Sequence, residues 1–317
     1  MSTEGGNKAV VAALLANTGI AITKFLAFAL TQSSSMLAEA IHSVADSGNQ
    51  LLLLLGGRRA SRAATPEHPF GFGRERYIYS FIVSIVLFSV GGLFALYEAY
   101  HKWHEVQENP GDLGQLDGRW FWVPLVVLGV AIVMESLSFR TAIGEANRDR
   151  GEASMVSYVR RAKAPELPVI LLEDFAALTG LTFALLGVGL TLITREPIFD
   201  VIGTGLIGLL LVVVAIVLAL ETKSLLLGEA ATPDAQRRID AAINGVEGID
   251  GVIHMRTLHL GPDELLVAAK IAVSAGESAA DVARAIDQAE AAIRKAEPVA
   301  RVIYLEPDIR RAAETDA

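Results

Sequence analysis

The sequence predicts an α-helical polytopic membrane protein with six transmembrane helices and a small C-terminal α+β domain. The chain of 317 residues is 52% hydrophobic and has a mean hydropathy of +0.43, which is too apolar for a soluble protein of this size. Apolar stretches of membrane-spanning length recur within residues 1–228, whereas residues 229–310 have the composition of a soluble domain. We therefore expect two domains, followed by a disordered tail over residues 311–317.

The six predicted spans each reach the length of about 20 mostly apolar residues that crossing the hydrocarbon core requires. The first is too long for a cleavable signal peptide and lacks a small-residue cleavage pattern, so we expect it to remain as a span. Because the number of spans is even, both chain ends are expected on the same side. The spans cover residues 8–30, 35–57, 77–101, 120–142, 168–194 and 198–226.

The charges of the predicted loops indicate which side that is. Basic residues concentrate in the loops after the second and fourth spans, whereas the other loops carry few. The positive-inside rule therefore predicts that both termini lie in the cytoplasm, and we expect the protein in the cell membrane. The basic residues of the two loops are Arg58, Arg59, Arg62, Arg74 and Arg76, and Arg148, Arg150, Arg160, Arg161 and Lys163.

The C-terminal domain is predicted to contain elements in the order αββαβ, as in ferredoxin-like and metallochaperone-like sandwiches. Thr232 and Pro233 form a helix start, and Ser278 is placed to cap a second helix. Residues 261–264 form a turn signal between two alternating apolar runs, which predicts a hairpin. The expected elements are a helix over 233–244, strands over 251–260 and 265–273, a helix over 279–295 and a strand over 300–305.

Several classes of function are excluded by composition and motifs. The chain has no cysteine, which excludes disulfides and thiolate metal ligands. Its net charge of -9 argues against nucleic acid as a partner. The sequence has no nucleophile-elbow motif, no paired-histidine zinc-protease motif and no glycine-rich phosphate loop, so we expect neither an enzyme nor a prosthetic group.

The second span carries polar residues that are costly in a membrane and usually functional there. His42 and Asp46 are four residues apart, so they share one face of a helix, and Glu39 and Asn49 extend the same row. Imidazole and carboxylate are both metal ligands. The alternative is that His42 and Asp46 only pair with each other inside a helix bundle.

The fifth span carries two consecutive acids, Glu173 and Asp174, about one turn inside its start. Adjacent helical residues point about 100° apart, so only one can face a given partner squarely. Together with His42 and Asp46 they could form a nitrogen and oxygen site that suits zinc and tolerates manganese, iron or cobalt. Glu173 could instead face water at the start of its span, and Asp200, at the start of the sixth span, is expected at the membrane interface.

Four short segments combine these residues in a distinctive way, namely residues 39–46, 49–50, 68–77 and 172–174. With six spans and an α+β tail, they resemble the cation diffusion facilitators, and within that family the zinc-transporter-9-like subgroup. The resemblance covers nearly the whole chain. It implies a homodimer that moves a divalent cation out of the cytosol in exchange for protons, with the tail as a dimerisation domain. It also implies four ligands shared by the second and fifth spans.

The chain departs from the family pattern at three places. Ile170 stands where zinc members carry a histidine, so Glu173, Glu39 or water would complete the metal shell, which leaves the metal selectivity open. In the loop after the second span His68 is kept, but Phe72 replaces a second histidine. In the tail the resemblance keeps His254 and Glu306 as further candidate ligands, while Ala269 and Tyr304 replace others.

The leading functional hypothesis is zinc efflux by metal/proton antiport with alternating access, with His42, Asp46, Asp174 and Glu173 as metal ligands. Protonation of imidazole and carboxylates competes with metal binding, which provides the coupling. The rival hypotheses are a manganese, iron or cobalt transporter of the same fold, and a membrane scaffold or metal-responsive assembly factor without transport. The expected partners are the cation, protons, the lipid bilayer and a second copy of the chain.

Overall fold

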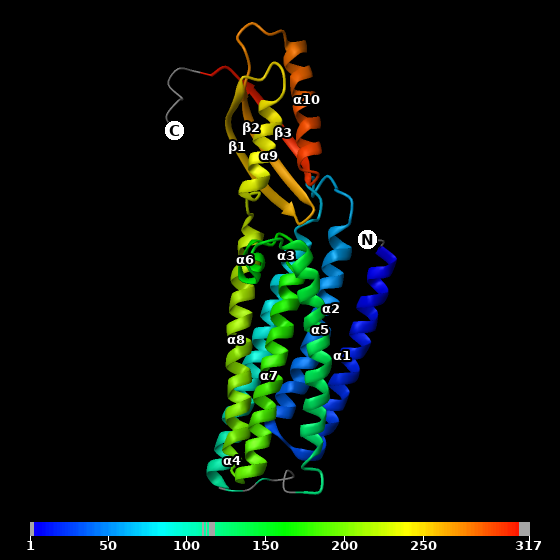
Figure 1. The fold of residues 1–317 in the computed structure, drawn as a ribbon, viewed down its shortest axis with the longest axis vertical. Coiled ribbons are helices and arrows are strands. Elements are labelled where there is room, and N and C mark those ends of the chain that lie inside the picture. The colour runs from blue at the N-terminus through cyan, green and yellow to red at the C-terminus, as the bar shows by residue number, and fades with distance from the viewer. Residues whose placement is uncertain (1–2, 110, 112, 114–117, 311–317) are drawn as a thin grey trace. The chain divides into compact units, whose positions relative to one another are not determined.

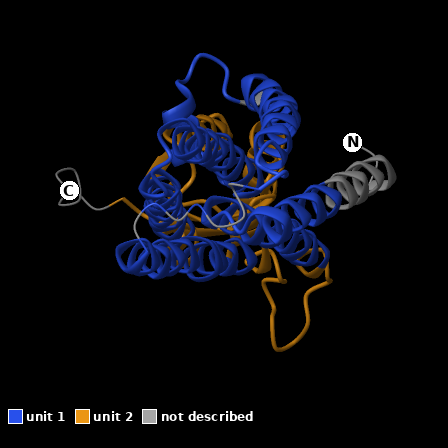
Figure 2. Cartoon of the chain, turned by 90° about the horizontal axis from the view of Figure 1, so that it is seen from below, with its two compact units in different colours: residues 1–58, 78–222 blue, residues 59–77, 223–317 orange. Residues whose placement is uncertain are grey.

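The computed structural model describes residues 3–109, 111, 113 and 118–310 of the chain. The predicted disordered tail, residues 311–317, lies outside the described residues. The chain divides into two compact units, coloured separately in Figure 2. The first comprises Met1–Arg58 and Ile78–Thr222, and the second comprises Arg59–Tyr77 and Lys223–Ala317.

The first unit is helical, and its long helices run alongside one another (Figure 1). A π-helical segment, η1, joins α3 to α4, and a short helix, α6, lies between α5 and α7. The elements are α1 (Thr3–Thr31), α2 (Ser34–Ala60), α3 (Glu75–Val86), η1 (Leu87–Leu93), α4 (Phe94–Glu108), α5 (Val123–Asp149), α6 (Met155–Arg161), α7 (Glu166–Thr194) and α8 (Ile198–Leu227).

Four helical stretches of the described chain are long and apolar enough to cross a membrane: Glu75–Glu108, Val123–Arg148, Glu166–Thr194 and Ile198–Leu227. They correspond to the third to sixth predicted spans. The helices α1 and α2, of 29 and 27 residues, cover the first two predicted spans. The row of polar residues makes α2 less apolar than the other spans, so the count of six spans stays a prediction.

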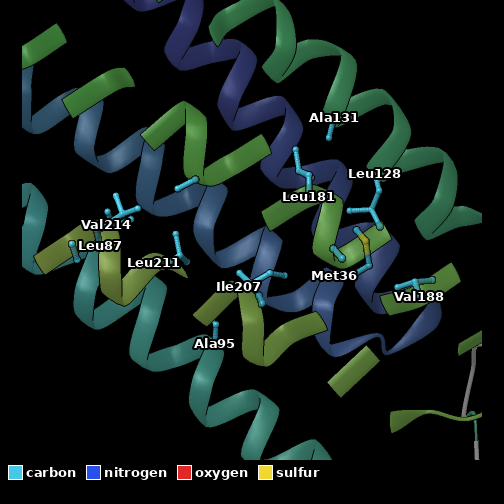
Figure 3. Packing of buried hydrophobic residues seen from close by; sticks show 14 of the residues in the cluster. Met36, Leu87, Ala95, Leu128, Ala131, Leu181, Val188, Ile207, Leu211 and Val214 are labelled. Atoms are coloured by element: carbon cyan, nitrogen blue, oxygen red, sulfur yellow. The ribbon is translucent and has the colours of Figure 1, made fainter. Parts of the chain in front are cut away.

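The core of the first unit is apolar and forms where α2, α5, α7 and α8 meet. Met36, Leu128, Leu181 and Ile207 are fully buried and gather in it (Figure 3). Glycine allows the backbones of α7 and α8 to approach closely: a Cβ at Gly187 would lie 2.9 Å from a carbonyl oxygen of α8. Small residues at such contacts are typical of helices packed in a membrane, where van der Waals contact replaces the hydrophobic effect.

The second unit contains a three-stranded sheet and two helices. Its elements are α9 (Pro233–Asn244), β1 (Gly251–Gly261), β2 (Glu264–Ala272), α10 (Ala279–Ala296) and β3 (Ala300–Asp308). The strands lie in the order β1-β2-β3, with β1 antiparallel and β3 parallel to β2. Apolar side chains of α9 and α10 pack with those of the sheet, and this core includes Ile239, Ile243, Val267, Ile271 and Ile293.

Both predicted helix caps of this unit are confirmed. The side chain of Thr232 accepts a hydrogen bond from the backbone N–H of Ala235, and that of Ser278 accepts one from Asp281. The predicted hairpin also forms, between β1 and β2. Such features depend on residues close in sequence, so they can be predicted without knowledge of the packing.

Residues 59–77, which contain most of the predicted loop between the second and third spans, belong to the second unit. A Cβ at Gly73 would lie 2.9 Å from the carbonyl oxygen of Leu260, so the loop backbone rests directly on the end of β1. Arg76 Nη1 also pairs with Asp263 Oδ2, 2.7 Å away in the hairpin turn. Gly71 adopts a left-handed conformation, with φ +73°, that favours glycine.

Candidate metal centre

The predicted polar face of α2 is present and buried. His42 Nε2 lies 3.5 Å from Asp46 Oδ2, and the two side chains are only 1% and 15% exposed. Within the described residues, neither ring nitrogen of His42 nor Oδ1 of Asp46 has a hydrogen-bond partner. Because buried polar atoms are nearly always paired, these nitrogen and oxygen atoms are suited to receive a bound ion.

A buried lysine of α1, which the sequence analysis did not single out, lies beside this face. Lys24 Nζ is 3.0 Å from Glu39 Oε2 and donates a hydrogen bond to Ser43 Oγ at 2.7 Å. Both charged side chains are almost fully buried. The ammonium therefore neutralises Glu39 in this conformation, while the second oxygen, Glu39 Oε1, has no hydrogen-bond partner among the described residues. The signal in the sequence was a charged side chain inside the first predicted span.

On α7 the two consecutive acids have different partners. Glu173 is 5% exposed and accepts a hydrogen bond from Asn49 Nδ2 of α2 at 2.7 Å, so it faces the interior rather than water. Asp174 is half-buried and accepts a hydrogen bond from Ser138 Oγ of α5 at 3.0 Å. The sequence pointed to Asn49 as part of the polar row, but it did not point to Ser138.

The charges of α2 and α7 are near enough to act on one another, since Asp46 interacts electrostatically with Asp174 and with Glu173. Nevertheless, no three histidine, aspartate or glutamate side chains in the described part of the chain are close enough to hold a metal ion together. The structure thus brings the candidate ligands to one region without closing a coordination shell. Ile170, at the position of the missing histidine, packs in an apolar cluster with Leu171.

Asp200, in the first turn of α8, is expected near the membrane interface from its place in the sequence, and it is buried within the bundle, only 3% exposed. Its carboxylate accepts hydrogen bonds from Ser33 Oγ at 3.0 Å, Ser34 N at 3.0 Å and Ser34 Oγ at 3.2 Å. It therefore caps the N-terminus of α2, where a negative charge is favourable. Because α2 begins about two turns before His42, this contact with α8 helps to position the candidate ligands.

The remaining candidates lie in the second unit and are not grouped as metal ligands. His68 is exposed, its ring rests on Phe72 with centroids 4.7 Å apart, and its backbone N–H bonds to Thr65. The strand register places Lys270 opposite both His254 and Glu306. Lys270 thus occupies the central strand between the two candidate ligands.

Lys270 also pairs with acids of β3. Its Nζ is 2.9 Å from Asp308 Oδ2 and 3.3 Å from Glu306 Oε1. Hydrogen bonds to these two carboxylates raise the pKa of Lys270, so the ammonium remains charged at neutral pH. A fixed positive charge at this point opposes the binding of a metal cation between His254 and Glu306.

Comparison with known proteins gives a consistent picture. A family model described as the cation efflux transmembrane domain matches residues 10–227. The human mitochondrial proton-coupled zinc antiporter SLC30A9 is 32% identical over 262 residues, which cover 81% of this chain and 44% of that protein. Metal tolerance protein C4 of Arabidopsis thaliana is 27% identical, over 86% of this chain and 58% of that protein.

A more distant relative is the magnetosome protein MamM of Paramagnetospirillum magneticum. It is 25% identical, over 79% of this chain and 72% of that protein. The chain spans about half the length of the antiporter and the plant protein.

Proposed function

The chain belongs to the cation efflux family, and we propose that it moves zinc across a membrane in exchange for protons. Membership in this family also agrees with the expectation that the chain is not an enzyme. The observation that carries the proposal is the buried face of α2, where His42 and Asp46 present unpaired nitrogen and oxygen atoms. The name of the human relative, a proton-coupled zinc antiporter, supports zinc as the cargo and protons as the counter-ion.

On this proposal zinc is bound by His42 and Asp46 of α2 together with Asp174 of α7, and Glu173 supplies a fourth ligand. Closing the shell requires Asp174 to exchange its contact with Ser138, and Glu173 its contact with Asn49, for the ion. Bound zinc needs a neutral imidazole and ionised carboxylates, so arriving protons displace it. Protonation of these groups then allows the site without metal to return to face the cytoplasm, which couples zinc efflux to proton influx.

The proposal includes six spans with both termini in the cytoplasm, and a homodimer that assembles through the ferredoxin-like C-terminal domain. The positive charges of two loops support the orientation. We retain the cell membrane as the proposed location. The human relative is named as mitochondrial, which makes an internal membrane the alternative.

A second candidate cargo is manganese, iron(II) or cobalt. It is favoured by Ile170, which packs among apolar residues at the position where the family pattern has an imidazole. The remaining donor set is richer in oxygen, and carboxylate oxygens suit harder cations better than zinc.

The test is metal-driven proton flux in proteoliposomes that contain a pH-sensitive dye. Zinc, manganese, iron(II) and cobalt are compared for the native chain, for Asp46→Asn and for Asp174→Asn. Asp287→Asn, at an exposed position on α10, is the matched control. We expect zinc-driven flux in the native and control proteins, and a loss of at least about tenfold in both site variants.

The other outcomes discriminate between the hypotheses. Flux with manganese, iron(II) or cobalt but not zinc would change the cargo and keep the site. Absence of flux with all four metals, in protein that remains folded, would refute transport and favour the scaffold.

A further inference from the structure

A pocket of about 600 Å³ lies in the first unit, between α5, α6, α7 and α8. Ten of its twelve lining side chains are apolar, and the two polar ones are Arg160 and Glu221. Its volume is in the range of pockets that hold organic ligands, about 300–1,000 Å³. The pocket is distinct from the candidate metal centre, because none of the proposed ligands lines it.

Most of the pocket lining is apolar, and Arg160 of α6 supplies one positive charge to it. The short helix α6 contributes Met155, Val156 and Val159 to the lining, and its last turn carries Arg160 and Arg161. Several apolar lining side chains are also exposed on the surface of the helical bundle, including Val156 at 66%, Leu220 at 60% and Phe175 at 48%. In a bundle that spans a membrane, such a pocket is open to the hydrocarbon chains of the surrounding lipid.

We propose that this pocket binds one anionic phospholipid, with an acyl chain between α5, α7 and α8 and the phosphate at Arg160. Basic pockets between transmembrane helices are suited to anionic head groups, and an amphipathic helix such as α6 lies naturally at the head-group level. The other polar lining residue, Glu221, carries a carboxylate that repels an anionic phosphate, so the head group is assigned to Arg160.

The lipid would support the part of α7 that carries the metal ligands. Leu172 and Phe175, which flank the two acids, line the pocket. Phe175 also contacts Phe139 of α5, with ring centroids 6.5 Å apart, one residue from the serine that holds Asp174. A bound acyl chain would therefore stabilise the contact between α5 and α7 on which the position of Asp174 depends.

The experiment measures lipid retention rather than transport, so its result is independent of the proposed function. The purified full-length protein is equilibrated in detergent with equal amounts of phosphatidylglycerol and phosphatidylcholine, and bound lipid is counted by native mass spectrometry. The variants are Arg160→Gln, which removes the charge, and Val159→Trp, which fills the pocket. Arg148→Gln is the matched control, because Arg148 is an exposed arginine in the last turn of α5 that does not line the pocket.

We expect the native and control proteins to retain one phosphatidylglycerol per chain in preference to phosphatidylcholine. Arg160→Gln should weaken phosphatidylglycerol binding about fivefold, the effect of one basic residue at a membrane surface. Val159→Trp should reduce the retention of both lipids. Equal retention of the two lipids by the native protein, or no effect of Arg160→Gln, would overturn the proposal. Displacement of the lipid by inorganic phosphate would also overturn it, because it would indicate a phosphate site without an acyl-chain pocket.

Discussion

The buried carboxylate of Asp200 gives a direct test of how α2 is held. Replacing Asp200 by alanine removes the acceptor for three donors at the start of α2, the N–H and hydroxyl of Ser34 and the hydroxyl of Ser33. All three residues are buried, so water does not replace the lost acceptor without a structural change. The variant is therefore expected to lose stability and to loosen the helix that carries His42.

The magnitude follows from the kind of donor. The Ser34 N–H is fixed by the helix and loses a hydrogen bond to a charged acceptor, which costs about 2 kcal/mol. Each serine hydroxyl can rotate toward another acceptor, so its loss costs about 1 kcal/mol. The expected cost of Asp200→Ala is thus about 4 kcal/mol. Asp200→Asn keeps one oxygen as an acceptor and should cost roughly half as much.

The assay is thermal unfolding of the full-length protein in detergent, followed by tryptophan fluorescence. A loss of about 4 kcal/mol should lower the Tm of Asp200→Ala by roughly 10 °C, with Asp200→Asn in between. Glu196→Ala, at an exposed acid just before α8, is the control and should leave the Tm unchanged. A Tm of Asp200→Ala equal to that of the control would refute the capping role.

Three further predictions concern other contacts. Lys24→Met leaves Glu39 as an unpaired buried charge and should lower the free energy of unfolding by about 3–5 kcal/mol. The Tm should recover when Glu39→Gln is added, and a Tm that stays low in the double variant would contradict the ion pair. Gly187→Ala places a methyl group against a backbone carbonyl of α8 and should lower the free energy of unfolding by about 1–3 kcal/mol. Gly189→Ala, in open space, is the control and should change the stability little. Equal Tm values for the two variants would contradict the close packing of α7 and α8. A hydrogen bond from Ser278 lowers the pKa of Asp281, so the ionised carboxylate stabilises the start of α10. At pH 6 the amides of α10 should therefore be better protected from hydrogen exchange in the native chain than in Asp281→Asn. This difference in protection should vanish as the pH falls below the lowered pKa of Asp281. A difference that persists in acid would contradict a role for the ionised carboxylate.

The sequence predicts well those features that depend on near neighbours. The helix starts at Thr232 and Ser278 follow because each of these side chains can cap the backbone N–H three positions later, and the hairpin follows from a turn between two alternating runs. The shared face of His42 and Asp46 follows from the geometry of a single helix. Each of these is settled within one element or between adjacent ones.

Contacts between distant helices could not be predicted in this way. Lys24 and Asp200 are single polar residues in or beside apolar segments, and nothing in the local pattern names their partners. The acceptor of the Ser34 N–H is 166 residues away, and Glu173 is 124 residues from Asn49. Such pairs are set by which helix faces meet, so a sequence of one chain shows that a partner is needed but not which residue provides it.

These contacts explain why the candidate ligands lie in one region but do not close a coordination shell. The helix that carries the candidate ligands His42 and Asp46 is held by α1 through Lys24 and by α8 through Asp200, whereas Asp174 is held by α5 through Ser138. The two halves of the centre are thus fixed to different helices, and the hydrogen bond from Asn49 to Glu173 joins them. A zinc ion bound by both halves must break the hydrogen bond between Asn49 and Glu173. Asn49→Ala removes this competing bond, so we expect it to strengthen zinc binding. Weaker zinc binding by Asn49→Ala, measured by isothermal titration calorimetry, would instead mean that Asn49 orients Glu173 for the ion.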